Sequence, residues 1–125
     1  MSGSELKSFH CGNPVLCAIF SPNDKIVIFG SDDGKIRMLD VKSNSLVQEF
    51  SGHSGSVNCL ALSRNGNLFA SGGGDSMVHL WKLSTCVKVC QFSGHSGAVH
   101  SIAFSPDGKM LASGGRDSEV VLWDV

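Results

Sequence analysis

The sequence predicts an all-β fold assembled from repeated four-stranded sheets, and two observations lead to this prediction. The first is an internal repeat: a shift of 42 residues matches the chain to itself without a gap, so that Asp33, Asp75 and Asp117 share one position. The second is that no segment shows a helical period, whereas Met77–Lys82 alternates with the two-residue period of a strand. Four short antiparallel strands repeated at this length are typical of the blades of a β-propeller.

The second repeat shows the predicted elements in order. It opens with a turn-rich stretch, and a buried strand, a hairpin, a second strand, a turn, a third strand and a fourth strand follow. The corresponding ranges are 50–55, 56–62, 64–67, 68–72, 73–76, 77–82 and 86–92. The hairpin contains Asn65-Gly66, a pair that accepts positive φ angles. Mixed small and β-branched residues in 56–62 are typical of a buried strand.

The repeat also predicts how the chain is divided. We expect a disordered end over residues 1–4 and a propeller segment over 5–125. Within that segment the blades are expected at about 9–50, 51–92 and 93–125. Residues 5–9 match the fourth strand of a repeat, so the third blade is expected to receive this strand from the chain itself or from a second copy.

Several short motifs recur at matching positions of the repeats. They are Gly-His before the first strand (Gly52-His53), a Ser-Pro-Asp-Gly hairpin (105–108), an Asp in the second hairpin and a Trp-Asp pair (Trp123-Asp124). Together these motifs resemble the WD-repeat (WD40) family over about residues 6–125. The second repeat departs from the family at Lys82, where the family has Asp. The resemblance implies a propeller whose N-terminal outer strand completes the C-terminal blade.

A set of four polar and aromatic residues occurs in both the second and the third repeat: His53, Ser71, Asp75 and Trp81, then His95, Ser113, Asp117 and Trp123. Ser, His and Asp suggest nucleophilic catalysis. However, the set occurs twice, and each copy includes a Trp, whose indole N–H can only donate. The resemblance implies a structural Trp–Ser–His–Asp network at these positions. We therefore predict no catalytic residues and no enzymatic activity.

The first repeat has lost most of this set. Cys11, Phe29 and Leu39 stand at the positions of His, Ser and Trp, and only Asp33 remains. Loss of one partner leaves the others unpaired at about 1–3 kcal/mol each, whereas joint replacement by apolar groups can be nearly neutral. We therefore expect packing alone to hold the first blade, with Asp33-Gly34 forming a type I′ turn.

Charge and cysteine content exclude several classes of site. The net charge is -1 and the basic residues are dispersed, which argues against nucleic acid as a partner. Isolated cations are expected to be solvated at turns or outward strand positions: Lys25, Arg37, Lys82, Lys109 and Arg116. No apolar run is long enough to span a bilayer, so no membrane association is expected. The cysteine count of 5 is odd and fits free thiols inside the cell, in the cytoplasm or the nucleus.

The remaining candidate sites favour structural roles. Cys86 and Cys90 are expected on one side of a strand, but no further ligands complete a zinc set, so no metal or cofactor is predicted. Cys17 and Cys59 occupy equivalent strand positions and are expected to pack in the core.

The resemblance also implies a function. WD-repeat proteins are non-catalytic platforms that bind peptides and protein surfaces on the end bearing the opening loops and second hairpins. The residues of this chain at those positions are Pro14, Leu16, Asp32, Ser56, Asn58, Gly74, Ala98, His100 and Arg116. We therefore expect a protein-interaction scaffold or adaptor. The alternatives are the substrate-receptor subunit of a ubiquitin ligase or another multiprotein complex, and a propeller hydrolase or lyase. The Trp-Asp-x-Arg pattern associated with the ligase role is absent at residues 81–84.

Three repeats are too few to close a ring, because propellers have four to eight blades. Two alternatives follow for the partner. Two copies of the chain form a homodimer that completes a six-bladed ring, or the chain is a fragment of a longer WD-repeat protein.

Overall fold

The computed structural model describes residues 2–125, and all eleven of its regular elements are β-strands. The strands are β1 (Val15–Phe20), β2 (Ile26–Ser31), β3 (Lys35–Asp40), β4 (Ser45–Ser51), β5 (Val57–Leu62), β6 (Leu68–Gly73), β7 (Met77–Lys82), β8 (Val87–Ser93), β9 (Val99–Phe104), β10 (Met110–Gly115) and β11 (Val120–Asp124). None of the described residues forms a helix of the length and hydropathy that a bilayer crossing requires. The predicted all-β fold of repeated antiparallel sheets is confirmed.

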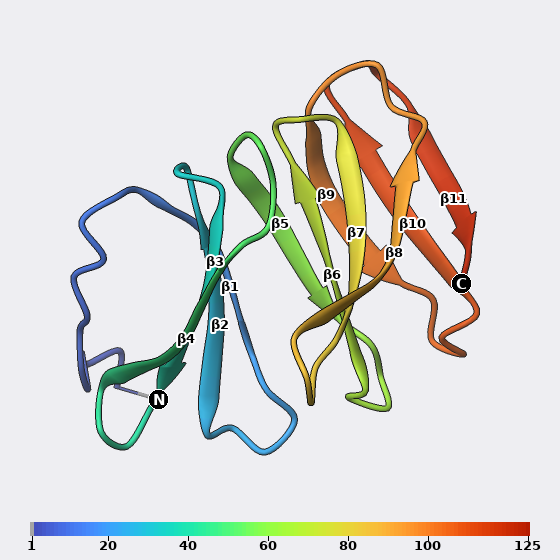
Figure 1. Ribbon diagram of the computed structural model, residues 1–125. Helices are drawn as coiled ribbons and strands as arrows, with labels where there is room; N and C mark the ends of the chain where they lie inside the picture. Colours follow the sequence, from blue (N-terminus) through green and yellow to red (C-terminus); the bar gives the residue numbers. More distant parts are fainter. Residues whose placement is uncertain (1) are drawn as a thin grey trace.

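The strands form three antiparallel sheets that follow one another in chain order (Figure 1). Sheet 1 contains β1–β4, sheet 2 contains β5–β8 and sheet 3 contains β9–β11. The innermost strands β1, β5 and β9 lie side by side. Each sheet therefore packs a face against its neighbour, as the blades of a partial propeller do.

Equivalent turns repeat in all three sheets. At the first hairpin, a Ser hydroxyl donates to an Asn or Asp side chain two residues later: Ser21 to Asn23, Ser63 to Asn65 and Ser105 to Asp107. The residue that follows has a positive φ of 62° at Asp24, 77° at Gly66 and 74° at Gly108. The predicted type I′ turn at Asp33-Gly34 is wrong, because only Gly34 has a positive φ there, at 83°.

Two apolar clusters fill the spaces between the sheets. The first joins sheets 1 and 2 around Ile28, Ile36, Met38, Leu60, Phe69 and Trp81, and the second joins sheets 2 and 3 around Cys59, Ala70, Val78, Leu80, Val99 and Leu111. Cys59 is buried and Cys17 packs against the first cluster, as predicted. Burial raises the pKa of Cys17 to about 11 and that of Cys59 to about 12. Both thiols are therefore inert packing groups.

Cys86 and Cys90 do not face the same side, which corrects the sequence prediction. Cys86 precedes β8 in a turn, where its φ is 57°, and it packs into the first cluster beside the Met38 thioether at 3.7 Å. Cys90 lies within β8 and packs into the second cluster. The turn reverses the alternation that a continuous strand would have imposed.

The N-terminal segment runs along the side of sheet 1 that faces away from sheet 2 (Figure 1). Residues 5–9, for which a strand was predicted, form none, and the part of sheet 3 that is described has three strands. The segment is anchored instead by Lys7, which donates to the carbonyls of Val41 and Lys42, and by Asn44, which donates to the Ser8 carbonyl at 3.0 Å. Of the end predicted to be disordered, Met1 lies outside the described residues.

Candidate functional site

In sheet 2 the structure brings the four predicted network residues into one chain of hydrogen bonds. The Trp81 indole N–H donates to Ser71 Oγ at 2.9 Å, and Ser71 Oγ lies 2.8 Å from His53 Nε2. His53 Nδ1 lies 2.9 Å from Asp75. The Asp75 carboxylate only accepts, so in a neutral imidazole Nδ1–H donates to it, and Nε2 accepts from the Ser71 hydroxyl, which itself accepts from the indole. This order fits a neutral imidazole, and burial lowers the pKa of His53.

The same chain of contacts recurs in sheet 3. Trp123 donates to Ser113 Oγ at 2.8 Å, Ser113 lies 2.7 Å from His95 Nε2, and His95 Nδ1 lies 3.0 Å from Asp117. The Ser96 backbone N–H donates to Asp117 at 2.9 Å, as Ser54 N–H does to Asp75 at 3.1 Å. Each network thus connects the opening loop, two strands and a hairpin within one sheet.

The two serines are buried, which bears on whether they could act as nucleophiles. Ser71 is 0% exposed and Ser113 is 1% exposed, and each hydroxyl accepts from an indole while it donates to an imidazole. A substrate carbonyl would have to displace one of these partners and the packing above it. The arrangement can therefore fix strands, and burial keeps both hydroxyls away from any substrate in solution.

Each network also requires a glycine beneath it. A Cβ at Gly115 would lie 2.5 Å from His95 Nδ1 and 2.6 Å from Asp117 Oδ1, and a Cβ at Gly73 would collide with the equivalent atoms of sheet 2. Sheet 1 has Ser31 at this position and Cys11 at the position of the histidine. Loss of the imidazole therefore creates the space that the Ser31 side chain fills.

Sheet 1 contains a second kind of polar network, which corrects two sequence predictions. Arg37 was expected to be solvated, but its side chain is 7% exposed. It bonds Asp33 at 2.7 Å, Glu49 at 3.0 Å and the Ser31 hydroxyl at 2.8 Å. Ser31 in turn donates to Asp33. Packing alone does not hold the first blade, because charge-assisted hydrogen bonds replace the lost His–Ser–Trp contacts.

His79 was missed from the sequence. It stands at the position of Arg37 in sheet 1 and Val121 in sheet 3. The signal in the sequence was therefore that the three repeats carry different residues at this position. The residue is 6% exposed, and its ring stacks on His53 with a centroid distance of 4.2 Å and an interplanar angle of 7°. Its Nδ1 is buried and has no hydrogen-bond partner.

His53, Asp75 and His79 are candidate ligands for a metal ion, because one ligand atom of each lies within 4.8 Å of the others. An ion bound by imidazole lies close to the ring plane. The two ring planes are nearly parallel and separated by stacking, so one ion cannot lie in both. His53 Nδ1 is also occupied by Asp75. The arrangement in this structure therefore does not fit a metal ion.

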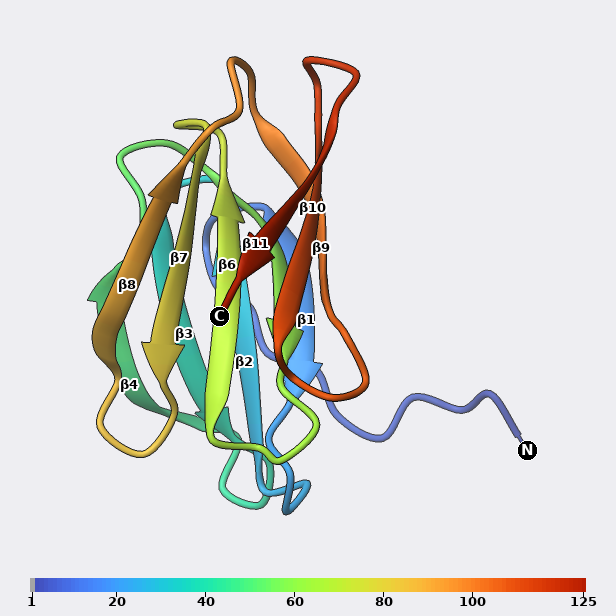
Figure 2. The same ribbon diagram turned by 90° about the vertical axis from the view of Figure 1, so that its right-hand side faces the viewer.

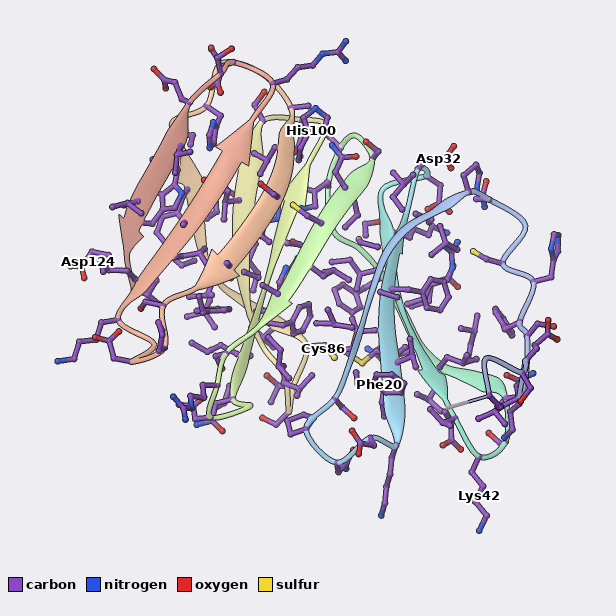
Figure 3. All side chains as sticks on the ribbon, turned by 180° about the vertical axis from the view of Figure 1, so that it is seen from behind. Phe20, Asp32, Lys42, Cys86, His100 and Asp124 are labelled. Carbon is purple, nitrogen blue, oxygen red and sulfur yellow. The ribbon has the colours of Figure 1, made fainter. Side chains whose placement is uncertain are left out.

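The residues predicted to face a partner lie at one end of the sheets. Three equivalent backbone bonds join each second hairpin to the preceding opening loop: Asp32 N–H to the Pro14 carbonyl at 3.1 Å, Gly74 to Ser56 at 2.8 Å and Arg116 to Ala98 at 2.8 Å. Asp32 and His100 project from this end, away from Lys42 (Figure 3). Six of the nine residues are exposed: Pro14, Leu16, Asp32, Gly74, His100 and Arg116.

The other three residues at this end are half-buried, and two of them have internal partners. Asn58 donates to the Val99 carbonyl at 3.0 Å and accepts from the Ser56 hydroxyl at 2.7 Å. Because Val99 belongs to sheet 3, Asn58 links neighbouring sheets. The surface available to a partner is therefore the set of six exposed residues.

Comparisons with known proteins agree with this geometry. The model of a family described as WD domain, G-beta repeat matches residues 3–40, 44–82 and 84–124. The solved structure of U3-55K superposes with a TM-score of 0.87 at 27% identity, over 94% of this chain and 38% of that chain. The crystal structure of the RRP9 WD40 repeats gives a TM-score of 0.87 at 27% identity, over 94% of this chain and 37% of that chain. The chain thus spans less than two fifths of both structures. A search of curated proteins by sequence gives no match.

Proposed function

The chain belongs to the WD40 repeat family, whose propellers generally serve as protein-interaction scaffolds, and we propose that it is a non-catalytic scaffold or adaptor. In this proposal, peptides or protein surfaces bind the end of the sheets that carries the opening loops and second hairpins. The contact residues are Pro14, Leu16, Asp32, Gly74, His100 and Arg116, with Ser56, Asn58 and Ala98 forming the half-buried layer beneath them.

One observation supports this assignment above the others: the exposed loops at this end are anchored by a repeated backbone bond, from each second hairpin to the opening loop of the same sheet. A surface presented on fixed loops binds with a smaller loss of conformational entropy than a mobile one. The exposed groups are mixed in character, with an acid at Asp32, a base at Arg116 and an apolar Leu16 that is 45% exposed. This mixture suits a protein surface better than a small ligand.

The absence of catalysis is part of the proposal. The burial of Ser71 and Ser113 supports it, since both Ser-His-Asp arrangements among residues 2–125 have an internal serine. A propeller hydrolase or lyase remains the alternative class, and a ubiquitin-ligase substrate receptor is a narrower form of the scaffold role. We place the protein inside the cell, in the cytoplasm or nucleus, on the strength of its five free cysteines.

The test is a pull-down with charge reversals at the two ends of the sheets. Asp32→Lys and Arg116→Glu alter the proposed binding end, and Lys42→Glu and Lys109→Glu are matched controls at exposed positions elsewhere. Proteins retained by the wild type and by both controls, but lost from an Asp32 or Arg116 variant, are the expected result. If all four variants retain the same proteins as the wild type, the assignment of this end is wrong.

We also propose that the scaffold works as part of a ring, with blades at about 9–50, 51–92 and 93–125. The described residues supply three sheets, and closed propellers have at least four blades. The other blades come from a second copy of the chain, which gives a homodimer with a six-bladed ring. Further repeats in a longer protein are the alternative source.

A further inference from the structure

The outer side of sheet 2 carries an open groove whose wall includes the buried His79. It lies towards the outer strands β4 and β8, which run along the side of the molecule opposite β1 and β9 (Figure 2). Ser51, Asp75, Lys88 and Gln91 line other parts of the groove. Sheets 1 and 2, which form it, each have all four strands. Its volume of about 490 Å³ falls within the range of about 300–1,000 Å³ that is typical of ligand sites.

The equivalent position in sheet 1 is completed from within the chain. Arg37 on β3 lies opposite Glu49 on β4, and the Glu49 carboxylate accepts from Arg37 Nε at 3.0 Å. The same carboxylate lies 3.5 Å from Lys35 Nζ. In sheet 2, His79 on β7 lies opposite Gln91 on β8 in the same register. A neutral amide therefore stands in sheet 2 where sheet 1 has a carboxylate.

Two groups in the wall of the groove are incompletely paired. Lys88 Nζ donates to the Gln91 side-chain oxygen at 2.9 Å, and it forms no ion pair with any of residues 2–125. His79 Nδ1 is buried without a partner, although buried polar atoms are nearly always hydrogen-bonded. Burial, and after it His53 and Lys88, lower the pKa of His79, so the charge of Lys88 acts on this ring. Both groups indicate a ligand that comes from outside the described residues.

The charges around the groove favour an anion as this ligand. Asp75 borders the groove, but its carboxylate already accepts from an imidazole and from two backbone N–H groups. These donors are His53 Nδ1 at 2.9 Å and the N–H groups of Ser54 and Met77, each at 3.1 Å. Lys88 has only a neutral partner, so its charge is available to a ligand. A carboxylate is the anion that sheet 1 has at this position, and ammonium and amide N–H groups are suitable donors to it.

We propose that the groove binds an acidic side chain of a partner protein, whose carboxylate accepts from Lys88 Nζ, from the Gln91 amide and from the His79 ring. The partner then supplies from outside the carboxylate that Glu49 supplies within sheet 1. An open groove on the outer side suits a side chain that projects from a protein surface. The inference extends the proposed scaffold role by a second contact, since none of the three donors belongs to the exposed set at the end of the sheets.

The test is an NMR titration of the full chain at pH 7 with blocked amino acids. N-acetyl-glutamate methylamide carries the carboxylate, and N-acetyl-glutamine methylamide is the neutral control of the same shape. The glutamate probe is expected to shift the backbone amide signals of Ser54, Lys88 and Gln91, and the glutamine probe is expected to leave them unchanged. N-acetyl-glycylglycine, whose carboxylate is terminal, distinguishes a chain end from a side chain. Equal shifts with the glutamate and glutamine probes, no shifts, or shifts with the terminal carboxylate alone would each overturn the proposal.

Three variants test the geometry of the site. Lys88→Gln removes the cation and is expected to weaken binding of the glutamate probe about fivefold. Gln91→Glu places in sheet 2 the carboxylate that sheet 1 has at this position, so it is expected to pair with Lys88 and abolish the shifts. Lys82→Gln changes an exposed lysine at the far end of β7, and it is the matched control that should bind as the wild type does.

The three substituted side chains are exposed, so amide spectra away from the groove are expected to match the wild type. Wild-type affinity in both Lys88→Gln and Gln91→Glu, or an equal loss in Lys82→Gln, would contradict the proposed site. The titration uses neither Asp32 nor Arg116. Failure of the acidic site is therefore distinguishable from failure of the scaffold role, which the pull-down tests separately.

Discussion

The stacked histidines of sheet 2 lead to a prediction about stability in acid. His79 is buried against His53, and burial, followed by the electrostatic effects of His53 and Lys88, lowers the pKa of His79 from 6.5 to about 4, against a smaller opposing effect of Asp75. These three groups are the ionisable neighbours of the ring. We expect replacement of His79 by Val, the residue that sheet 3 has at this position, to remove a loss of stability that otherwise sets in as the pH falls.

The sign and size follow from proton linkage. Between pH 6.5 and about 4 the unfolded chain binds a proton at His79 that the folded chain does not, so the free energy of unfolding decreases as the pH falls through this window. A difference of this size between the pKa values of the folded and the unfolded chain corresponds to about 3 kcal/mol in the free energy of unfolding. The ring borders an open groove lined by Lys88 and Gln91, where solvent screens charge. We therefore expect about 1–2 kcal/mol between pH 7 and pH 4.

The assay is urea unfolding of the wild type and His79→Val at several pH values across this window. The wild type should lose about 1–2 kcal/mol more than the variant on acidification. Val121→His, which places an imidazole beside His95 in sheet 3, should increase the loss relative to the wild type. If the stability difference between the wild type and His79→Val is the same at pH 7 and pH 4, the reasoning is refuted.

Three further substitutions test the networks by chemical unfolding. Ser113→Ala leaves an indole and an imidazole unpaired and should cost about 3 kcal/mol, and a loss below 1 kcal/mol would show that water replaces the hydroxyl. Asp33→Asn should cost about 2–3 kcal/mol because Arg37 loses its closest charged partner. Asp33→Leu combined with Arg37→Met should cost less than that single change. A double variant whose cost is the sum of its two single changes would argue against coupling. Gly115→Ala should cost about 2 kcal/mol through overlap with His95, and an unchanged midpoint would disprove the steric requirement.

The repeat made most of the fold predictable, because one shift places the first three strands of each sheet against two other copies and β4 against β8. The same shift places the Trp, Ser, His and Asp residues of the two sheets at matching positions, and the resemblance to the WD40 family implies the contacts between them. The strand over residues 5–9 did not form, since a strand needs a partner edge and the alternation within a segment does not say whether that edge is present. The side on which Cys86 lies depends on one residue with positive φ, and no alternation pattern predicts that.

The first blade shows why position-by-position comparison fell short. Counting Cys11, Phe29 and Leu39 as losses suggested that packing alone remained. The same alignment also contained two gains, Ser31 in place of glycine and Arg37 in place of His79. Each gain depends on a loss, because Ser31 needs the space left by the imidazole and Arg37 needs the carboxylate that the imidazole no longer occupies. In a repeat protein, the substitutions within one blade must therefore be interpreted together, as a set of contacts that changes jointly.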